Sequence, residues 1–152
     1  MNILNLKEEA YHIGQLSEWH HNEWSYLNPD GSVEKRADKM KMYLGSELVP
    51  STFIGKDGEE LIGSAAIVES DMDTHEELSP WLASVYVSSN NRKKGYGASL
   101  VMHVMEKAKE QGIEKLYLFT PSEETFYKNI GWCKKYEENY RGHLVTVMEV
   151  TL

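Results

Sequence analysis

Apolar residues recur along this chain of 152 residues with two different spacings. Short apolar runs rich in β-branched and aromatic residues predict strands at 2–6, 51–54, 61–68, 81–87, 115–120, 132–136 and 144–151. Apolar residues three or four positions apart predict amphipathic helices at 8–24, 32–43, 97–112 and 123–130. This order of elements predicts an α/β fold built around one mixed sheet.

Residues at the ends of the predicted elements support these boundaries. Asp57-Gly58 is a strong hairpin signal between two of the strands. Ser32 can cap the second helix, and Gly112 can end the third in a left-handed conformation. A polar connection at 69–80 precedes the strand at 81–87, and no linker, repeat or low-complexity segment divides the chain. Residues 1–152 are therefore expected to form a single domain.

A basic, glycine-containing segment joins the strand at 81–87 to the third predicted helix. Its sequence is Arg92-Lys93-Lys94-Gly95-Tyr96-Gly97. The glycines allow a tight turn and a close approach of a ligand, so that free N–H groups of the helix start can point at one anion. The helix dipole and the three basic side chains add positive charge. The segment completes neither a Walker A nor a dinucleotide fingerprint, yet it predicts a pyrophosphate cradle.

Three motifs in order resemble the GNAT superfamily of acetyl-CoA-dependent N-acetyltransferases. They are the strand Leu82–Val87, the segment Arg92-x-x-Gly95-x-Gly97, and Phe126-Tyr127-Lys128-Asn129-Ile130-Gly131-Trp132. The resemblance implies a GNAT-like, mostly antiparallel twisted sheet of six to seven strands, flanked by about four helices. It also implies an acetyl-CoA half at about 81–152 and an acceptor half at about 1–80, although specific motifs cover only about 81–132.

The resemblance further implies which residues bind acetyl-CoA. Backbone groups of the strand before the loop would bond the pantetheine arm like an added strand. Threonine replaces an asparagine that bonds the cofactor arm in many relatives, and its hydroxyl can make only part of that contact. The implied residues are Val85, Tyr86 and Val87 for the arm, Arg92, Lys93, Lys94, Gly95, Tyr96, Gly97 and Ala98 for the pyrophosphate, and Thr120 at the asparagine position.

Tyr127 is the expected catalytic acid, because relatives place a tyrosine at this position to protonate the departing thiolate of coenzyme A. A thiol titrates near about 8.5 and a phenol near about 10, so a neutral phenol can lend a proton at ordinary pH. The alternative is that Tyr127 packs like Phe126 and makes only a structural hydrogen bond.

A general base is harder to assign from sequence. Some relatives carry a carboxylate at the start of the strand before the loop, where this chain has Trp81. Glu69 and Asp71, in the polar connection at 69–80, are the candidates to bind the amine or to act as a water-linked base. Most acidic residues of such a connection are simply solvated. Neighbouring His20 and His21 point to different sides of a helix, and no metal is implied.

The composition of the chain indicates in which cellular compartment the protein is expected and which partners it favours. The chain has 24 acidic and 16 basic residues, a net charge of −8 and a single cysteine. Nucleic-acid binding is disfavoured, no apolar run approaches the roughly 20 residues of a membrane span, and a cytoplasmic protein is expected. The acidic balance favours a cationic small-molecule or peptide amine as acceptor. The valines of the last strand, Val145, Val147 and Val150, suggest a homodimer formed by edge pairing.

These observations predict an acyltransferase that transfers an acetyl group from acetyl-CoA to a primary amine by direct attack. Two alternatives stay open at the level of sequence. One is a catalytically silent sensor that binds acyl-CoA and uses the acceptor side for a partner. The other is an acyltransferase with a longer acyl donor, which the residues around Val85 do not distinguish.

Overall fold

The computed structural model describes all residues from 1 to 152 and contains one seven-stranded sheet. The strand order is β1-β2-β3-β4-β5-β7-β6, and only the β4–β5 pair is parallel. The strands are β1 (Asn2–Asn5), β2 (Ser51–Asp57), β3 (Glu60–Val68), β4 (Trp81–Val87), β5 (Lys115–Thr120), β6 (Cys133–Tyr140) and β7 (His143–Thr151). The predicted mixed, mostly antiparallel α/β sheet is confirmed.

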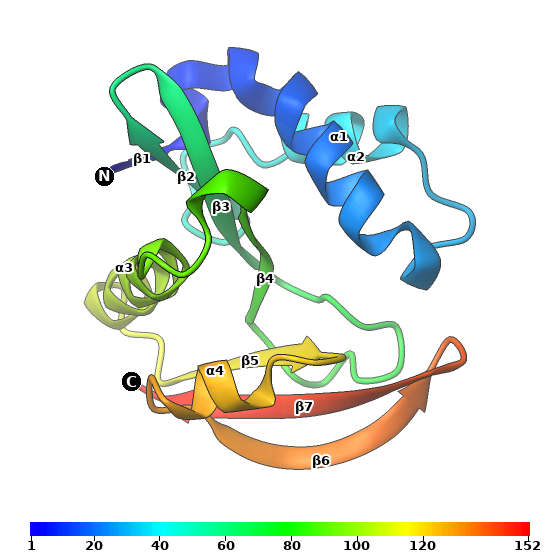
Figure 1. The fold of residues 1–152 in the computed structure, drawn as a ribbon. Helices are drawn as coiled ribbons and strands as arrows, with labels where there is room; N and C mark the ends of the chain where they lie inside the picture. The colour runs from blue at the N-terminus through cyan, green and yellow to red at the C-terminus, as the bar shows by residue number, and fades with distance from the viewer.

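Four α-helices and three short 3₁₀ segments complete the fold. They are η1 (Leu6–His12), α1 (Ile13–Trp24), η2 (Ser25–Leu27), α2 (Val33–Lys41), η3 (Ser89–Asn91), α3 (Tyr96–Glu110) and α4 (Glu124–Lys128). Helices α1 and α2 pack together over one face of β1–β3, and α3 lies across the opposite face of β2–β4 (Figure 1). No helix combines the length and the apolarity that a bilayer crossing requires.

The apolar face of α3 contributes to the largest core cluster of the protein. Leu100, Val101, Val104 and Ala108 are fully buried against the sheet, as a stripe of residues three and four positions apart should be. This packing fixes the start of α3, and therefore the glycine-containing loop before it, on the end of β4. Ser32 caps α2 as expected, because its hydroxyl accepts a hydrogen bond of 3.0 Å from the Lys35 amide.

The first predicted helix differs most from the structure. The expected helix at 8–24 is a 3₁₀ segment up to His12, broken at Glu9 (φ −143°, ψ 61°), and the α-helix begins at Ile13. Glu9 accepts hydrogen bonds from Lys56 (2.7 Å) on β2 and contacts His12 (3.0 Å). This tertiary contact, which no local spacing encodes, overrides the helical geometry at Glu9.

Strands β6 and β7, at one end of the sheet, also differ from what was expected. Strand β6 continues to Tyr140 rather than ending near 136, because it pairs with β7 up to Tyr140 and His143. Its mostly polar, exposed residues give no apolar run from which this length could be predicted. Strand β7 lies between β5 and β6, and its valines are buried in the core of one chain: Val145 is 1%, Val147 0% and Val150 6% exposed. Those valines therefore cannot provide the edge pairing on which the expected dimer rested.

Gly63 is required where β3 approaches β4. A Cβ atom on Gly63 would overlap the Tyr86 carbonyl oxygen, whereas one on Gly14, on the exposed side of α1, would meet nothing within 4 Å. We expect Gly63→Ala to lower the free energy of unfolding by about 1–3 kcal/mol. Gly14→Ala should raise it by about 0.4–1 kcal/mol through helix propensity and chain entropy. Urea unfolding of the two variants measures both signs, and equal effects would contradict the close approach.

Candidate active site

The sheet opens between its two central strands. Strand β4 pairs with β5 only at Trp81 and Tyr117, and the strands diverge beyond that point (Figure 1). A cavity of about 810 Å³ fills the opening, and Val85, Tyr86 and Val87 line it from β4. The side of β4 that faces β5 is thus left without a strand partner along these residues, as required for binding an extended ligand by strand addition.

A bulge in β4 fixes this divergence. Ser84 adopts a left-handed conformation (φ 53°), and the β3–β4 register shifts between Ser64 and Ala66. The Ser64 hydroxyl donates to the Ser84 carbonyl at 2.8 Å and lies 2.8 Å from His20 Nε2. Because the single hydroxyl hydrogen goes to Ser84, His20 must donate from Nε2. Burial lowers the pKa of His20 to about 3, so this imidazole is neutral and links α1 to the bulge.

The loop before α3 has the geometry of an anion site. Lys93 and Gly95 have left-handed φ values of 63° and 83°, and no side chain caps the helix. The first intrahelical bond runs from the Ser99 amide to the Gly95 carbonyl at 3.1 Å. The amides of Tyr96, Gly97 and Ala98 therefore have no helical partner, and all three residues line the cavity.

The basic side chains of this loop have different positions. Arg92 Nε donates to the Val87 carbonyl at 2.9 Å, and its guanidinium lies 5.5 Å from the Tyr86 ring centre and 3.9 Å from a Glu23 oxygen. Arg92 therefore holds the loop on β4 and is itself held there. Lys93 lines the cavity, whereas Lys94 does not.

Thr120 and Tyr127 lie on the β5 side of the cavity. The buried Thr120 hydroxyl accepts a hydrogen bond of 2.9 Å from the Glu123 amide and so fixes the turn that starts α4. Tyr127, in α4, is 8% exposed and packs against Phe126 and Trp132. Burial, with the negative charges of Glu123 and Asp71, raises the pKa of the Tyr127 phenol far above its usual value. The phenol is therefore protonated in the cavity.

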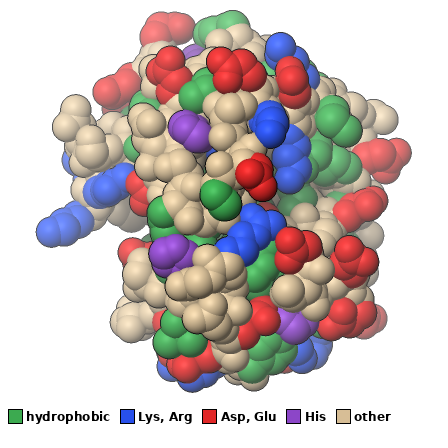
Figure 2. All heavy atoms as spheres, turned by 90° about the vertical axis from the view of Figure 1, so that its right-hand side faces the viewer, with side chains coloured by type: hydrophobic (Ala, Val, Ile, Leu, Met, Phe, Trp, Pro, Cys, Tyr) green, Lys and Arg blue, Asp and Glu red, His purple; other side chains and the backbone are tan.

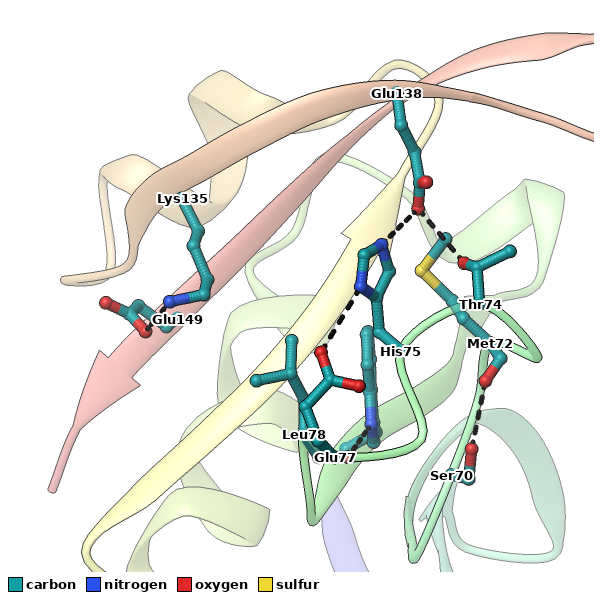
Figure 3. A network of polar contacts seen from close by, with 10 residues as sticks. Ser70, Met72, Thr74, His75, Glu77, Leu78, Lys135, Glu138 and Glu149 are labelled. Carbon is teal, nitrogen blue, oxygen red and sulfur yellow. Dashed lines mark hydrogen bonds and ion pairs between the residues drawn. The ribbon is translucent and has the colours of Figure 1, made fainter.

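The acidic residues of the connection at 69–80 do not all lie at the cavity. Asp71 lines the cavity, whereas Glu69 is exposed and lies outside its lining. His75 Nε2 lies 2.9 Å from Glu138 Oε1, and the Thr74 hydroxyl lies 3.3 Å from the same oxygen (Figure 3). These contacts fasten the connection to β6. The structure thus brings Asp71 and Tyr127 into one site and leaves Glu69 outside it.

Burial raises the pKa of the Asp71 carboxyl to about 7, and the positive charges of Lys39, Arg36 and Arg141 oppose this rise. The burial effect dominates because no cation lies within ion-pair distance of Asp71. A carboxyl that titrates near neutral pH inside a cavity is a typical general base. It can gain or release a proton under physiological conditions.

The cavity is more basic than the protein as a whole. Its ionised lining holds three acidic residues, Glu23, Asp71 and Glu123, against six basic ones, Lys35, Arg36, Lys39, Arg92, Lys93 and Arg141. Figure 2 shows Lys and Arg side chains near the middle of the open side of the molecule. The contribution of α2 was not predicted from the sequence, although Lys35, Arg36 and Lys39 are spaced to share one helix face.

Comparisons with known proteins identify the family. The model of the acetyltransferase (GNAT) family matches residues 13–132, and the chain belongs to this family. The fold is that of solved GNAT acetyltransferases, which confirms the resemblance seen in the three motifs. A comparison with curated protein sequences gives no significant match.

Three similar structures illustrate the range of this fold. A type Ii aminoglycoside 6'-acetyltransferase superposes with a TM-score of 0.76 at 20% identity, covering 99% of this chain and 97% of that one. An aminoglycoside 6'-N-acetyltransferase in complex with coenzyme A gives 0.79 at 18% identity, with coverages of 99% and 97%. A ribosomal-protein-alanine N-acetyltransferase from Brucella melitensis gives 0.76 at 16% identity and covers both chains completely, at 100% each. The TM-scores and the nearly complete coverage show a shared fold.

Proposed function

We propose that this protein transfers an acetyl group from acetyl-CoA to a primary amine by direct attack. The supporting observation is that one cavity holds the unpartnered amides of α3, the unpaired side of β4, Tyr127 and Asp71. The amides suit a pyrophosphate, and the open strand suits the amide groups of a pantetheine arm. Both are parts of acetyl-CoA, and coenzyme A is bound in a similar structure.

In this proposal Asp71 is the general base. An alkylammonium ion with a pKa near about 10.4 costs about 4–5 kcal/mol to deprotonate at pH 7. A carboxyl with a pKa of about 7 is substantially ionised at that pH and is near the optimum for accepting the proton. Glu69 lies on the solvent-exposed side of the same connection and is the weaker candidate.

Tyr127 serves the leaving group. The ammonium group first loses one proton to Asp71, which releases it to solvent. As the amine nitrogen then bonds to the thioester carbon, the C–S bond breaks, and the second proton of the nitrogen passes to Asp71. The phenol hydrogen-bonds the departing sulfur and can donate its proton to it; the phenolate then regains a proton from solvent, to which Asp71 also releases its own. Because a phenol is a weaker acid than a thiol, complete transfer costs at least about 2 kcal/mol. The hydrogen bond to the developing thiolate is therefore the main contribution of Tyr127.

Release of free thiol from acetyl-CoA over a panel of amines tests the proposal. We expect amine-dependent release by the native chain and loss of cofactor binding in Gly95→Glu, which places a carboxylate at the anion site. Gly112→Glu is the matched control, because Gly112 has nearly the same φ (86° against 83°) at the other end of α3. It should bind acetyl-CoA normally.

The same assay separates the two alternatives. Acetyl-CoA binding without release from any amine would contradict the transferase and favour an acyl-CoA sensor. Faster release from thioesters with longer acyl chains would instead identify a different acyl donor.

A further inference from the structure

One wall of the cavity carries positive charge without a partner in the protein. Arg36 is half-buried in α2, lies 5.6 Å from the Trp24 ring centre, and has no carboxylate within ion-pair distance. Lys39, one helical turn further on, likewise makes no ion pair. Burial of the Arg36 guanidinium lowers its pKa, which means that the fold holds this cation at a cost. A group in that position suits an anion supplied from outside.

Three of the four other cations of the cavity are already engaged, and the fourth, Lys93, belongs to the loop before α3. Arg92 is held by Val87 and Glu23. Lys35 donates to the Asp30 carbonyl at 2.6 Å. Arg141 donates to Asp73 at 3.0 Å and to the Leu27 carbonyl at 3.0 Å. The free positive charge on the acceptor side is therefore concentrated at Arg36 and Lys39 of α2.

The Asp71 carboxyl lines the same cavity and lies within the electrostatic range of this pair. The positive charges of Arg36 and Lys39 act to lower the pKa of Asp71, yet neither cation lies within 4 Å of its carboxylate. The carboxylate and the two cations are therefore close enough to interact electrostatically and too far apart to form an ion pair. Such an arrangement matches a small molecule that carries an ammonium group and an anionic group a few bonds apart.

We propose that the acceptor is a small primary amine bearing a carboxylate or phosphate, with its anion on Arg36 and Lys39 and its amine toward Asp71. This inference rests on the acetyltransferase proposed above and refines its substrate. It replaces the cationic acceptor expected from the net charge of the chain. A polycationic aminoglycoside or a polyamine would place further positive charge against Arg36 and Lys39, where only repulsion is available.

Matched acceptor pairs test the charge requirement directly. β-Alanine is compared with β-alaninamide, and phosphoethanolamine with ethanolamine, by the rate of thiol release from acetyl-CoA. We expect the anionic member of a pair to have a kcat/KM at least about tenfold higher, as one charge-assisted hydrogen bond provides. The two pairs also distinguish a carboxylate from a phosphate, because a site shaped for one should favour that pair.

Variants of α2 test whether Arg36 binds the anionic group of the acceptor. Arg36→Gln should reduce the preference for the anionic member about tenfold, mainly through a higher KM, and Arg36→Lys should restore part of it. Lys41→Gln is the matched control, because it removes one charge from the same helix at an exposed position outside the cavity. It should leave the preference unchanged.

The outcomes separate this inference from the function on which it rests. Release with amides and polyamines but not with anionic amines would overturn the acceptor assignment and leave the acetyltransferase standing. An equal loss on both members of a pair in Arg36→Gln would also overturn it, because it would reveal a purely structural arginine. Absence of release with every amine would overturn the acetyltransferase, and the acceptor assignment with it.

Discussion

Tyr127→Phe is expected to lower kcat by about 10²–10⁴-fold while changing the affinity for acetyl-CoA little, which is the usual loss when a group that hydrogen-bonds or protonates the leaving group is removed. The phenylalanine keeps the contacts of the ring with Phe126 and Trp132, so that only the hydroxyl is lost. Steady-state kinetics with a saturating amine, together with a binding titration of acetyl-CoA, measure the two quantities separately.

A tyrosine outside the cavity provides the control for this loss. Tyr136 is partly buried on β6 and is not part of the cavity lining, so Tyr136→Phe should retain full activity. If Tyr127→Phe retains kcat within a factor of about two, well below the usual effect of an acid catalyst, Tyr127 is only a packing residue. A rise in the Kd for acetyl-CoA without a fall in kcat would point the same way.

Asp71→Asn should produce the second large loss, again about 10²–10⁴-fold in kcat/KM for an amine that is protonated at neutral pH. The native enzyme should also lose activity as the pH falls below about 7, because the Asp71 carboxyl is then protonated and cannot accept a proton. The inflection that ends this acid limb near pH 7 should be absent from the variant, whose residual activity should follow only the fraction of unprotonated amine. A pH–rate profile of kcat/KM for both proteins measures it.

Glu69→Gln is the matched control for Asp71→Asn, because it neutralises an exposed carboxylate two residues away in the same connection. It should leave the rate and the acid limb unchanged. Loss of the limb in Glu69→Gln, and its survival in Asp71→Asn, would reverse the assignment of the base.

Asp71→Asn should also stabilise the fold. A carboxyl whose pKa rises from about 4 when unfolded to about 7 when folded favours the folded state at low pH, and this contribution disappears as the pH rises through 7. At pH 8 the ionised group costs up to about 4 kcal/mol. Partial exposure and the neighbouring Arg36, Lys39 and Arg141 reduce the gain in Asp71→Asn to roughly 1–3 kcal/mol. Urea unfolding at pH 8 and at pH 4 should show the gain only at pH 8.

The parts of the site that could be predicted from sequence are those in which local order determines the geometry. The loop at 92–97 follows a strand and starts a helix, and that context alone predicts unpartnered amides at an anion site. Asp71 was among the candidates only because the connection at 69–80 is acidic. Its selection over Glu69 depends on which side of the connection faces the cavity, which sequence spacing does not specify.

Two further features depend on contacts between distant segments. The link from His20 to Ser84 joins residues that are 64 positions apart through Ser64. In sequence His20 stands out only as a neighbour of His21, and the two serines do not stand out. Arg36 looks like an ordinary basic residue of a surface helix until the fold places it in the cavity without a partner. The overall acidity of the chain suggested the opposite charge preference, because net charge does not describe a local surface.

The neutral His20 affects how a titration of this enzyme should be interpreted. An inflection near pH 7 in an enzyme's activity is commonly attributed to imidazole. Here the one histidine that lines the cavity, His20, stays unprotonated down to a pH of about 3. The inflection would therefore belong to a carboxyl group, whose ionisation absorbs much less heat than that of imidazole. Its midpoint should consequently remain almost constant when the assay temperature is changed, whereas a histidine midpoint would move.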